Sequence, residues 1–210
     1  MHIKLQESPH LHPTQSANTT HSVDHVVHRK SPIASSPTRT ANIHTTQIES
    51  LKAEEDACVL PRFDSDVAWE LGTLIRAQCQ KHARPAVVYI AHANSSQLLF
   101  FAASRPGTLP DNMHWVKRKE AVVLRWGVST WRMRAQTQIA SPGMDMQAAL
   151  KARYEIADPS VYACHGGGFP VRVEGVEGVV GVIVVSGLKQ EDDHAVIVEG
   201  IREYLGRVKQ

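Results

Sequence analysis

The clearest hydrophobic pattern in the chain lies in its last third. Residues 179–185 (VVGVIVV) form a continuous, largely β-branched run, which is typical of a strand covered on both faces of a sheet. A shorter strand is expected over residues 171–173, joined to that run by a tight turn at residues 174–178. The final helix is expected from Glu191 to about Gly206, because acidic residues stabilise the start of a helix.

Two more strands and three more helices are expected between residues 65 and 156. Residues 86–91 and 98–103 are apolar runs on either side of a polar turn, which predicts a β-hairpin. Apolar residues at helical spacing predict helices over residues 65–82, 111–126 and 144–156. Helices and strands do not alternate strictly in this order. The pattern therefore favours an α/β fold of the α+β type, with helices packed on an antiparallel sheet, over a doubly wound parallel fold.

The composition of the chain changes near residue 62. Phe63 is the first Phe, Trp or Tyr in the sequence, and residues 1–45 are rich in Ser, Thr, Pro and His. Such a segment cannot bury enough apolar surface to offset the entropy lost on ordering, so we expect residues 1–45 to form a disordered tail. Residues 46–58 have the spacing of a short amphipathic helix, so the folded domain is expected to span residues 46–210.

Seven of the twelve histidines lie in this tail, and two interpretations of them are open. A zinc site is one, since imidazole is a common zinc ligand. The irregular spacing of these histidines and the lack of a cysteine in the tail favour the other, a solvated segment. The tail also lacks the apolar core of a secretory signal.

Charge, hydropathy and cysteine content exclude several classes of function. The formal charge is only +2, so no nucleic-acid partner is expected. No apolar run approaches the roughly 20 residues of a spanning helix, so no membrane span is expected. The three cysteines, Cys58, Cys79 and Cys164, are odd in number and widely spaced. This suits a reducing, cytoplasmic location rather than a disulfide framework.

A basic and aromatic segment lies between residues 115 and 134. It carries six Lys or Arg residues against the single acid Glu120, with three tryptophans among them. Charged side chains beside indoles could hold an anionic planar ligand, such as haem through its propionates, or a nucleotide. The alternative, which we favour, is an amphipathic helix whose tryptophans pack against the sheet. The ligand-binding candidates of this segment are Trp115, Arg118 and Lys119.

His165 precedes three glycines in the segment at residues 164–170 (CHGGGFP). Glycine allows positive φ angles and close approach of the backbone, so the amides of Gly166 and Gly167 could bind an anion beside the imidazole. In the alternative interpretation the glycines permit a bend, and His165 bonds to the backbone. No Lys-Ser or Lys-Thr pair follows the glycines, so the segment is not a phosphate-binding loop.

His194 shares a helical face with Ile197, so it is expected to point toward the sheet near the start of the last helix. Burial and the helix dipole favour its neutral form, which can bind a metal or haem iron. The alternative is a core histidine, with Ser186 as its expected partner. Cys164 and His165 are adjacent in an extended segment and point to opposite sides, so they cannot form a nucleophilic dyad. We assign no catalytic residue and no metal site.

Four motifs occur in a fixed order along the chain. They are LPRF at residues 60–63, PGTLPDN at 106–112, YACHGGGFP at 162–170, and VSGL at 185–188 followed by DDH at 192–194. Together, over about residues 46–206, they resemble the haem-degrading (GlcG/HbpS-like) protein family, and most closely its uncharacterised branch in fungi and bacteria. The resemblance implies a profilin-like fold with a five-stranded antiparallel sheet flanked by helices. It also implies homo-oligomers, with dimers assembling into rings, but no settled activity.

These observations lead to two hypotheses from different classes. The first is an oligomeric protein that binds a small anionic or aromatic, haem-like ligand without established catalysis. Its ligand-binding residues are expected to be Trp115, Arg118, Lys119, His165, Gly166, Gly167, Ser186 and His194. The alternative is an oligomeric scaffold that acts through protein–protein contacts, with the basic and aromatic helix as its interface. True haem oxygenation would need an iron ligand and an oxygen-activating pocket that the sequence does not locate.

Overall fold

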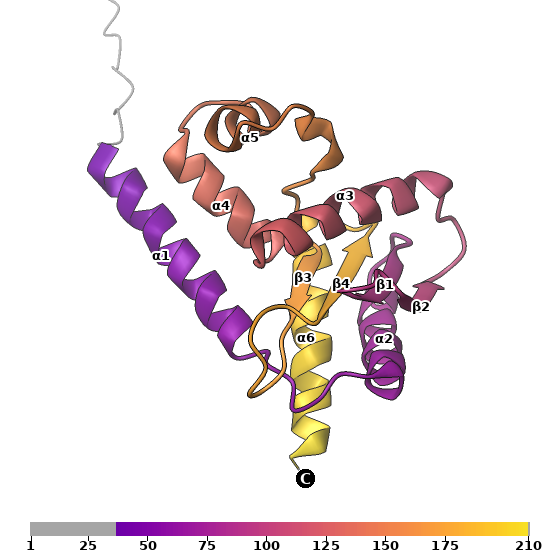
Figure 1. Ribbon diagram of the computed structural model, residues 1–210. Coiled ribbons are helices and arrows are strands. Elements are labelled where there is room, and N and C mark those ends of the chain that lie inside the picture. The colour runs from indigo at the N-terminus through magenta and orange to yellow at the C-terminus, as the bar shows by residue number, and fades with distance from the viewer. Residues whose placement is uncertain (1–36, 210) are drawn as a thin grey trace, which may run out of the picture. The chain divides into compact units, whose positions relative to one another are not determined.

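An antiparallel sheet of four strands forms the centre of the domain (Figure 1). The computed structural model describes residues 37–209, with side chains from residue 45 onward. The strands are β1 (Val87–His92), β2 (Leu98–Ala103), β3 (Gly168–Val171) and β4 (Gly181–Ser186). Their order in the sheet is β2-β1-β4-β3, and each neighbouring pair is antiparallel. The α+β fold class and the central, covered position of the valine-rich strand are therefore confirmed.

The prediction of a five-stranded sheet is wrong for the described residues, which form four strands. The strand expected over residues 171–173 begins earlier, at Gly168, because Gly168 already pairs with Val184 of β4. The chain leaves the sheet after Val171, and Val173 makes only an isolated parallel bridge to Leu60. This bridge is too short to count as a further strand.

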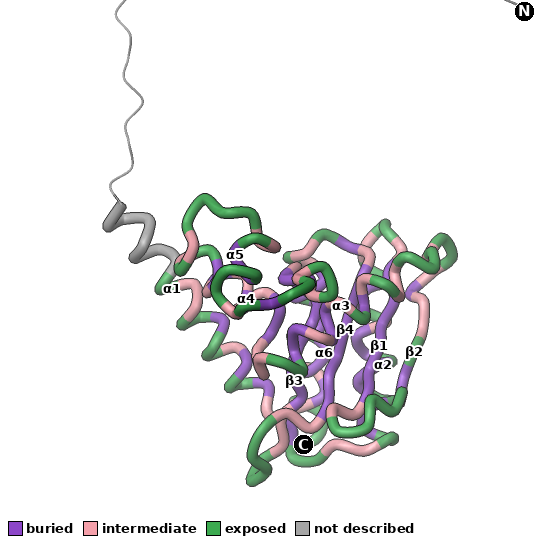
Figure 2. Tube along the Cα trace, turned by 45° about the horizontal axis from the view of Figure 1, so that its top comes forward, coloured by how far each residue is buried: buried purple, intermediate pink, exposed green. Residues whose placement is uncertain are grey.

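Helices cover both faces of the sheet, following the alternation of side chains along the strands. On β1, Val88 and Ile90 pack into the larger core, which is completed by α2 (Ser65–Gln80) and α6 (Gln190–Val208). Val87, Tyr89 and Ala91 point to the opposite face, where α3 (Pro110–Trp126) covers them. Figure 2 shows that burial concentrates on β1, β3 and β4, whereas the edge strand β2 is mostly intermediate or exposed.

The ends of the helices follow the local sequence. Asp64 caps α2 by accepting the backbone N–H groups of Asp66 and Val67. Pro110 occupies the first turn of α3, and the amide oxygen of Asn112 accepts the N–H of Leu109. Gly127, at φ +65°, ends α3 in the left-handed conformation that glycine favours.

Three helices form a second group beside the sheet: α1 (Pro37–Asp56), α4 (Thr130–Ala140) and α5 (Met146–Tyr154), followed by a short 3₁₀ turn at Pro159–Val161. Helix α4 was not among the predicted elements, because its mean hydropathy is low and its apolar residues lack a clear period. Helix α1 begins nine residues before its predicted start at residue 46. The remainder of the predicted tail, residues 1–36, lies outside the described residues.

The structure bears on the predictions made above about a membrane span and about the cysteines. Within residues 37–209, no helix is both long enough and apolar enough to span a membrane. All three cysteines are buried and unpaired. Burial raises the pKa of the Cys79 and Cys164 thiols to about 12, so both behave as small core residues rather than as reactive groups.

Candidate functional site

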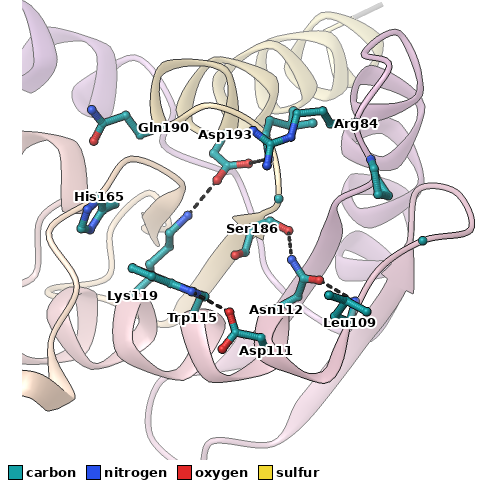
Figure 3. Close-up of a pocket in the computed structure, with 14 residues that line it drawn as sticks. Arg84, Leu109, Asp111, Asn112, Trp115, Lys119, His165, Ser186, Gln190 and Asp193 are labelled. Carbon is teal, nitrogen blue, oxygen red and sulfur yellow. Dashed lines mark hydrogen bonds and ion pairs between the residues drawn. The ribbon is translucent and has the colours of Figure 1, made fainter.

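A cavity of about 390 Å³ opens beside the end of β4, between the first half of α3, the glycine segment and the start of α6 (Figure 3). Such a volume lies at the lower end of the range for small-molecule pockets. The polar and aromatic residues that line it are Arg84, Asp111, Asn112, Trp115, Lys119, His165, Ser186, Gln190 and Asp193. Segments far apart in the sequence thus converge on one concave surface.

A buried ion pair between Lys119 and Asp193 forms one wall of the cavity. The Lys119 Nζ lies 2.9 Å from Asp193 Oδ2 and donates a further hydrogen bond to the carbonyl oxygen of Val185 at 2.8 Å. Asp193 Oδ1 accepts the backbone N–H of Leu188 at 3.0 Å. Burial lowers the pKa of the Lys119 ammonium and raises the pKa of the Asp193 carboxyl, in each case against the attraction of the partner. Burial therefore disfavours the charged form of both groups, whereas the charge of each partner favours it.

His165 lies against Trp115, with ring centroids 5.1 Å apart in an edge-to-face arrangement. Its Nδ1 is buried and has no hydrogen-bond partner among the described residues. Burial lowers the pKa of His165, and the positive charges of Arg134, Lys119 and Arg118 lower it further. A neutral imidazole in a positive electrostatic environment therefore faces the cavity.

Arg118 stands behind the cavity rather than in its lining. Its guanidinium lies over the Trp115 ring, 4.6 Å from the centroid, and its Nε donates to the carbonyl oxygen of Ser160 at 2.7 Å. The opposite end of that indole, Nε1, donates to Asp111 at 3.0 Å. Trp115 is therefore fixed from two sides and presents a rigid aromatic wall.

Gly166 and Gly167 are buried, and the structure requires glycine at both positions. A side chain on Gly166 would collide with the carbonyl oxygen of Gln190. At Gly167 the backbone has φ +106°, and an added Cβ would lie 2.7 Å from the Cβ of Asp193. The glycines thus allow the chain to pass close to α6, as in the bend interpretation. They are not the exposed anion-binding amides that the first interpretation required.

His194 lies outside the cavity, although its neighbour Asp193 lines it. The imidazole is buried against Phe169, and its Nε2 lies 3.1 Å from Glu54 Oε2 of α1. It is therefore a core histidine, as the alternative proposed, but its partner is Glu54 instead of Ser186. Its placement removes it from the set of residues that could touch a ligand here.

The structure thus brings together four of the eight predicted site residues: Trp115, Lys119, His165 and Ser186. Arg118 and the two glycines support them from behind, and His194 is separate. Sequence reasoning missed Asp193, Gln190 and Asn112 as lining residues. Asp193 is one of the acidic residues at the start of the last helix, and nothing in the sequence shows that Lys119, 74 positions away, reaches it.

The donor set gives no sign of a metal centre. Among the described residues, no group of three or more His, Cys, Asp or Glu side chains is placed to hold a metal ion. His165 is the one imidazole in the cavity lining, and its lining carboxylates, Asp111 and Asp193, already accept hydrogen bonds.

Comparison with known proteins gives consistent results. Residues 63–202 match the family model described as "Haem degrading protein HbpS-like". A "UPF0303 protein" of Streptomyces avermitilis is 39% identical over 160 residues, which cover 76% of this chain and 91% of that relative.

Two solved structures show the same fold. The structure titled "Crystal structure of Ybr137w protein" aligns with 82% of this chain and 97% of its own, at 26% identity and a TM-score of 0.70. The structure titled "Crystal Structure of PduOC:Heme Complex" covers 69% of this chain and 94% of its own, with a TM-score of 0.51. At 18% identity, the second similarity concerns the fold alone.

Proposed function

Because the chain belongs to the HbpS-like haem-degrading protein family, we propose that it is a ligand-binding protein whose cavity takes a small, planar, anionic molecule. Membership confirms the resemblance seen in the four sequence motifs. The observation that carries the proposal is the position of His165, which lines the cavity beside Trp115 in a positive environment. No catalytic step is assigned on this basis.

The electrostatics around His165 favour an anion. The same charges of Arg134, Lys119 and Arg118 that disfavour a proton on the imidazole would stabilise a negative group placed beside it. In return, a bound anion would raise the pKa of His165 and allow it to donate a hydrogen bond. The indole of Trp115 supplies a flat aromatic surface in the cavity lining, which favours a planar ligand.

Haem fits this cavity only in part. His165 could ligate iron through a ring nitrogen, and Arg84 on the rim could pair with a propionate. A cavity of about 390 Å³ would enclose one edge of a porphyrin and leave the rest in solvent. A ligand smaller than haem therefore satisfies the lining better, and we derive no iron chemistry for this chain.

A binding titration tests the proposal. Purified protein is titrated with phenylacetate and, separately, with haemin, and the change in tryptophan fluorescence on binding reports occupancy. We expect saturable binding of phenylacetate at one site per chain, weakened about tenfold by His165→Ala. The matched control is His114→Ala, on an exposed histidine of α3. Equal affinity in wild type and His165→Ala would contradict the proposed site, and so would a lack of saturation.

Self-assembly is a second candidate function, and exposed apolar side chains on the edge strand β2 support it. Leu98 and Phe101 of β2 are 52% and 45% exposed. The β2 strand is at the edge of the sheet, so its outer backbone groups can pair with a second copy of the chain. The tryptophans expected to form an interface, Trp115, Trp126 and Trp131, are partly buried instead.

This assembly is tested by light scattering on the full chain. We expect a homo-oligomer in which Phe101→Lys lowers the average mass, because a charge would be buried between two β2 edges. Leu124→Lys, on an exposed leucine of α3, is the control. An unchanged mass in Phe101→Lys would place any interface elsewhere. The three unpaired, buried cysteines suit the cytoplasmic location in which we place this assembly.

A further inference from the structure

The amine of Lys119 is buried, yet it lines the cavity. Its side chain is 4% exposed, and its Nζ is held by two acceptors, Val185 O and Asp193 Oδ2. A lysine ammonium carries three donors, so these two bonds leave one N–H position for the cavity. Figure 3 shows the amine directed toward Asp193, with His165 on its other side. A primary amine therefore lies in the wall of the cavity.

The surroundings also make this amine a better nucleophile than a surface lysine. Burial favours the uncharged form of Lys119 and lowers its pKa. Asp193 lies 2.9 Å away and can take the proton that the amine must lose before it attacks. Gly167 lies beside the Nζ and has no side chain. A Cβ added there would lie 2.8 Å from the Nζ and would crowd the amine.

We propose that Lys119 captures small 2-oxo acids as a reversible imine, with Asp193 as the group that accepts and returns the proton. This inference rests on the proposed function, since the carboxylate of the oxo acid would be the anion that lies beside His165. The adjacent carbonyl carbon would then lie toward Lys119. A 2-oxo acid with an aromatic substituent uses all three features: the cations, the amine and the Trp115 wall.

The step balances without any further reactant. The Lys119 ammonium gives one proton to Asp193, and the free amine forms a C–N bond with the carbonyl carbon. The carbonyl oxygen takes up the proton held by Asp193, which gives a carbinolamine. Loss of this hydroxyl as water, with a proton from the nitrogen, leaves a protonated imine and an ionised Asp193.

Charge conservation makes this product compatible with the buried pair. The protonated imine keeps the positive charge at the position of Nζ and retains one N–H for Asp193. Only the hydrogen bond to the carbonyl oxygen of Val185 is lost. Neither carboxylate nor cation is therefore left buried without a partner, which would be the costly outcome.

Reductive trapping tests the proposal on the full chain. The protein is incubated with phenylpyruvate and cyanoborohydride, and the products are measured by intact mass and peptide mapping. We expect one adduct per chain, at Lys119, formed about tenfold faster than at the exposed Lys189, because the site concentrates and orients the reactants. Phenyllactate has a hydroxyl in place of the carbonyl, so it should bind, form no adduct and slow the trapping of phenylpyruvate.

Two variants complete the test. Lys119→Arg keeps a cation beside Asp193 but cannot form an imine, so the adduct should disappear, whereas Lys189→Arg should react like the wild type. The mapped site in the wild type decides the question even if Lys119→Arg fails to fold. Adducts spread over surface lysines would overturn the imine. Phenyllactate binding without any Lys119 adduct would also overturn it, while leaving the proposed function intact. A failure of both ligands to bind would overturn both proposals.

Discussion

Glu55 of α1 and Arg132 of α4 form an ion pair of 2.9 Å in which the carboxylate is almost completely buried. The other carboxylate oxygen accepts the backbone N–H of Ser129, which caps α4, at 2.9 Å. One side chain therefore holds the start of α4 in two ways. The adjacent Glu54 contacts His194 and Arg202 of α6, so α1 is attached to two different helices.

Replacing Glu55 by alanine should destabilise the fold by about 2–4 kcal/mol, because it leaves the Arg132 charge and the Ser129 N–H without their partner. Urea unfolding followed by circular dichroism measures this change. Asp56→Ala is the control, since Asp56 pairs with Lys52 on the exposed side of the same helix. A loss in Glu55→Ala no larger than in the control would show that α1 is not anchored by this carboxylate.

Two truncations should distinguish the contribution of the predicted tail to stability from that of helix α1. Deleting residues 1–36 is expected to change the free energy of unfolding by less than about 0.5 kcal/mol. It is also expected to leave the number of chains per oligomer unchanged. Deleting residues 1–56 removes the buried Leu51 and Glu55 and should destabilise the domain strongly. The two proteins are compared by thermal unfolding and light scattering. A strong loss with the shorter deletion would mean that the tail contributes to the core.

Gly167→Ala should cost more than about 3 kcal/mol, because the new Cβ would collide with the carbonyl oxygen of Val185 and crowd Asp193. The matched control is Gly143→Ala. Gly143 also has a positive φ, +79°, but no atom lies within 4 Å of its added Cβ, so only the backbone term of about 1 kcal/mol remains. Equal losses in urea unfolding would show that the close approach at Gly167 does not matter.

The sequence predicted best those elements whose hydrophobic pattern is local. The valine run of β4, the hairpin of β1 and β2, and the apolar face of α2 all match their predicted ranges within a few residues. Helix α4 was not predicted, because polar contacts such as that between Glu55 and Arg132 hold it in place. These contacts join residues 77 positions apart. The Lys119–Asp193 pair was not predicted either, because its two residues are also far apart in the sequence. His194 was correctly expected to be buried, but its partner on α1 could not be inferred from the period of α6 alone.

Acidification should destabilise the protein partly through His165. Burial and three nearby cations hold the pKa of this imidazole below its ordinary value of 6.5, so the folded state resists the proton that the unfolded chain accepts. This contribution to stability is complete above pH 6.5 and is lost as the pH falls below it. We expect urea unfolding at pH 7.5 and 5.5 to show a smaller pH dependence in His165→Gln than in wild type. His114→Gln, on an exposed histidine, should behave like the wild type. The same pH dependence in all three proteins would mean that His165 is not held neutral by the fold.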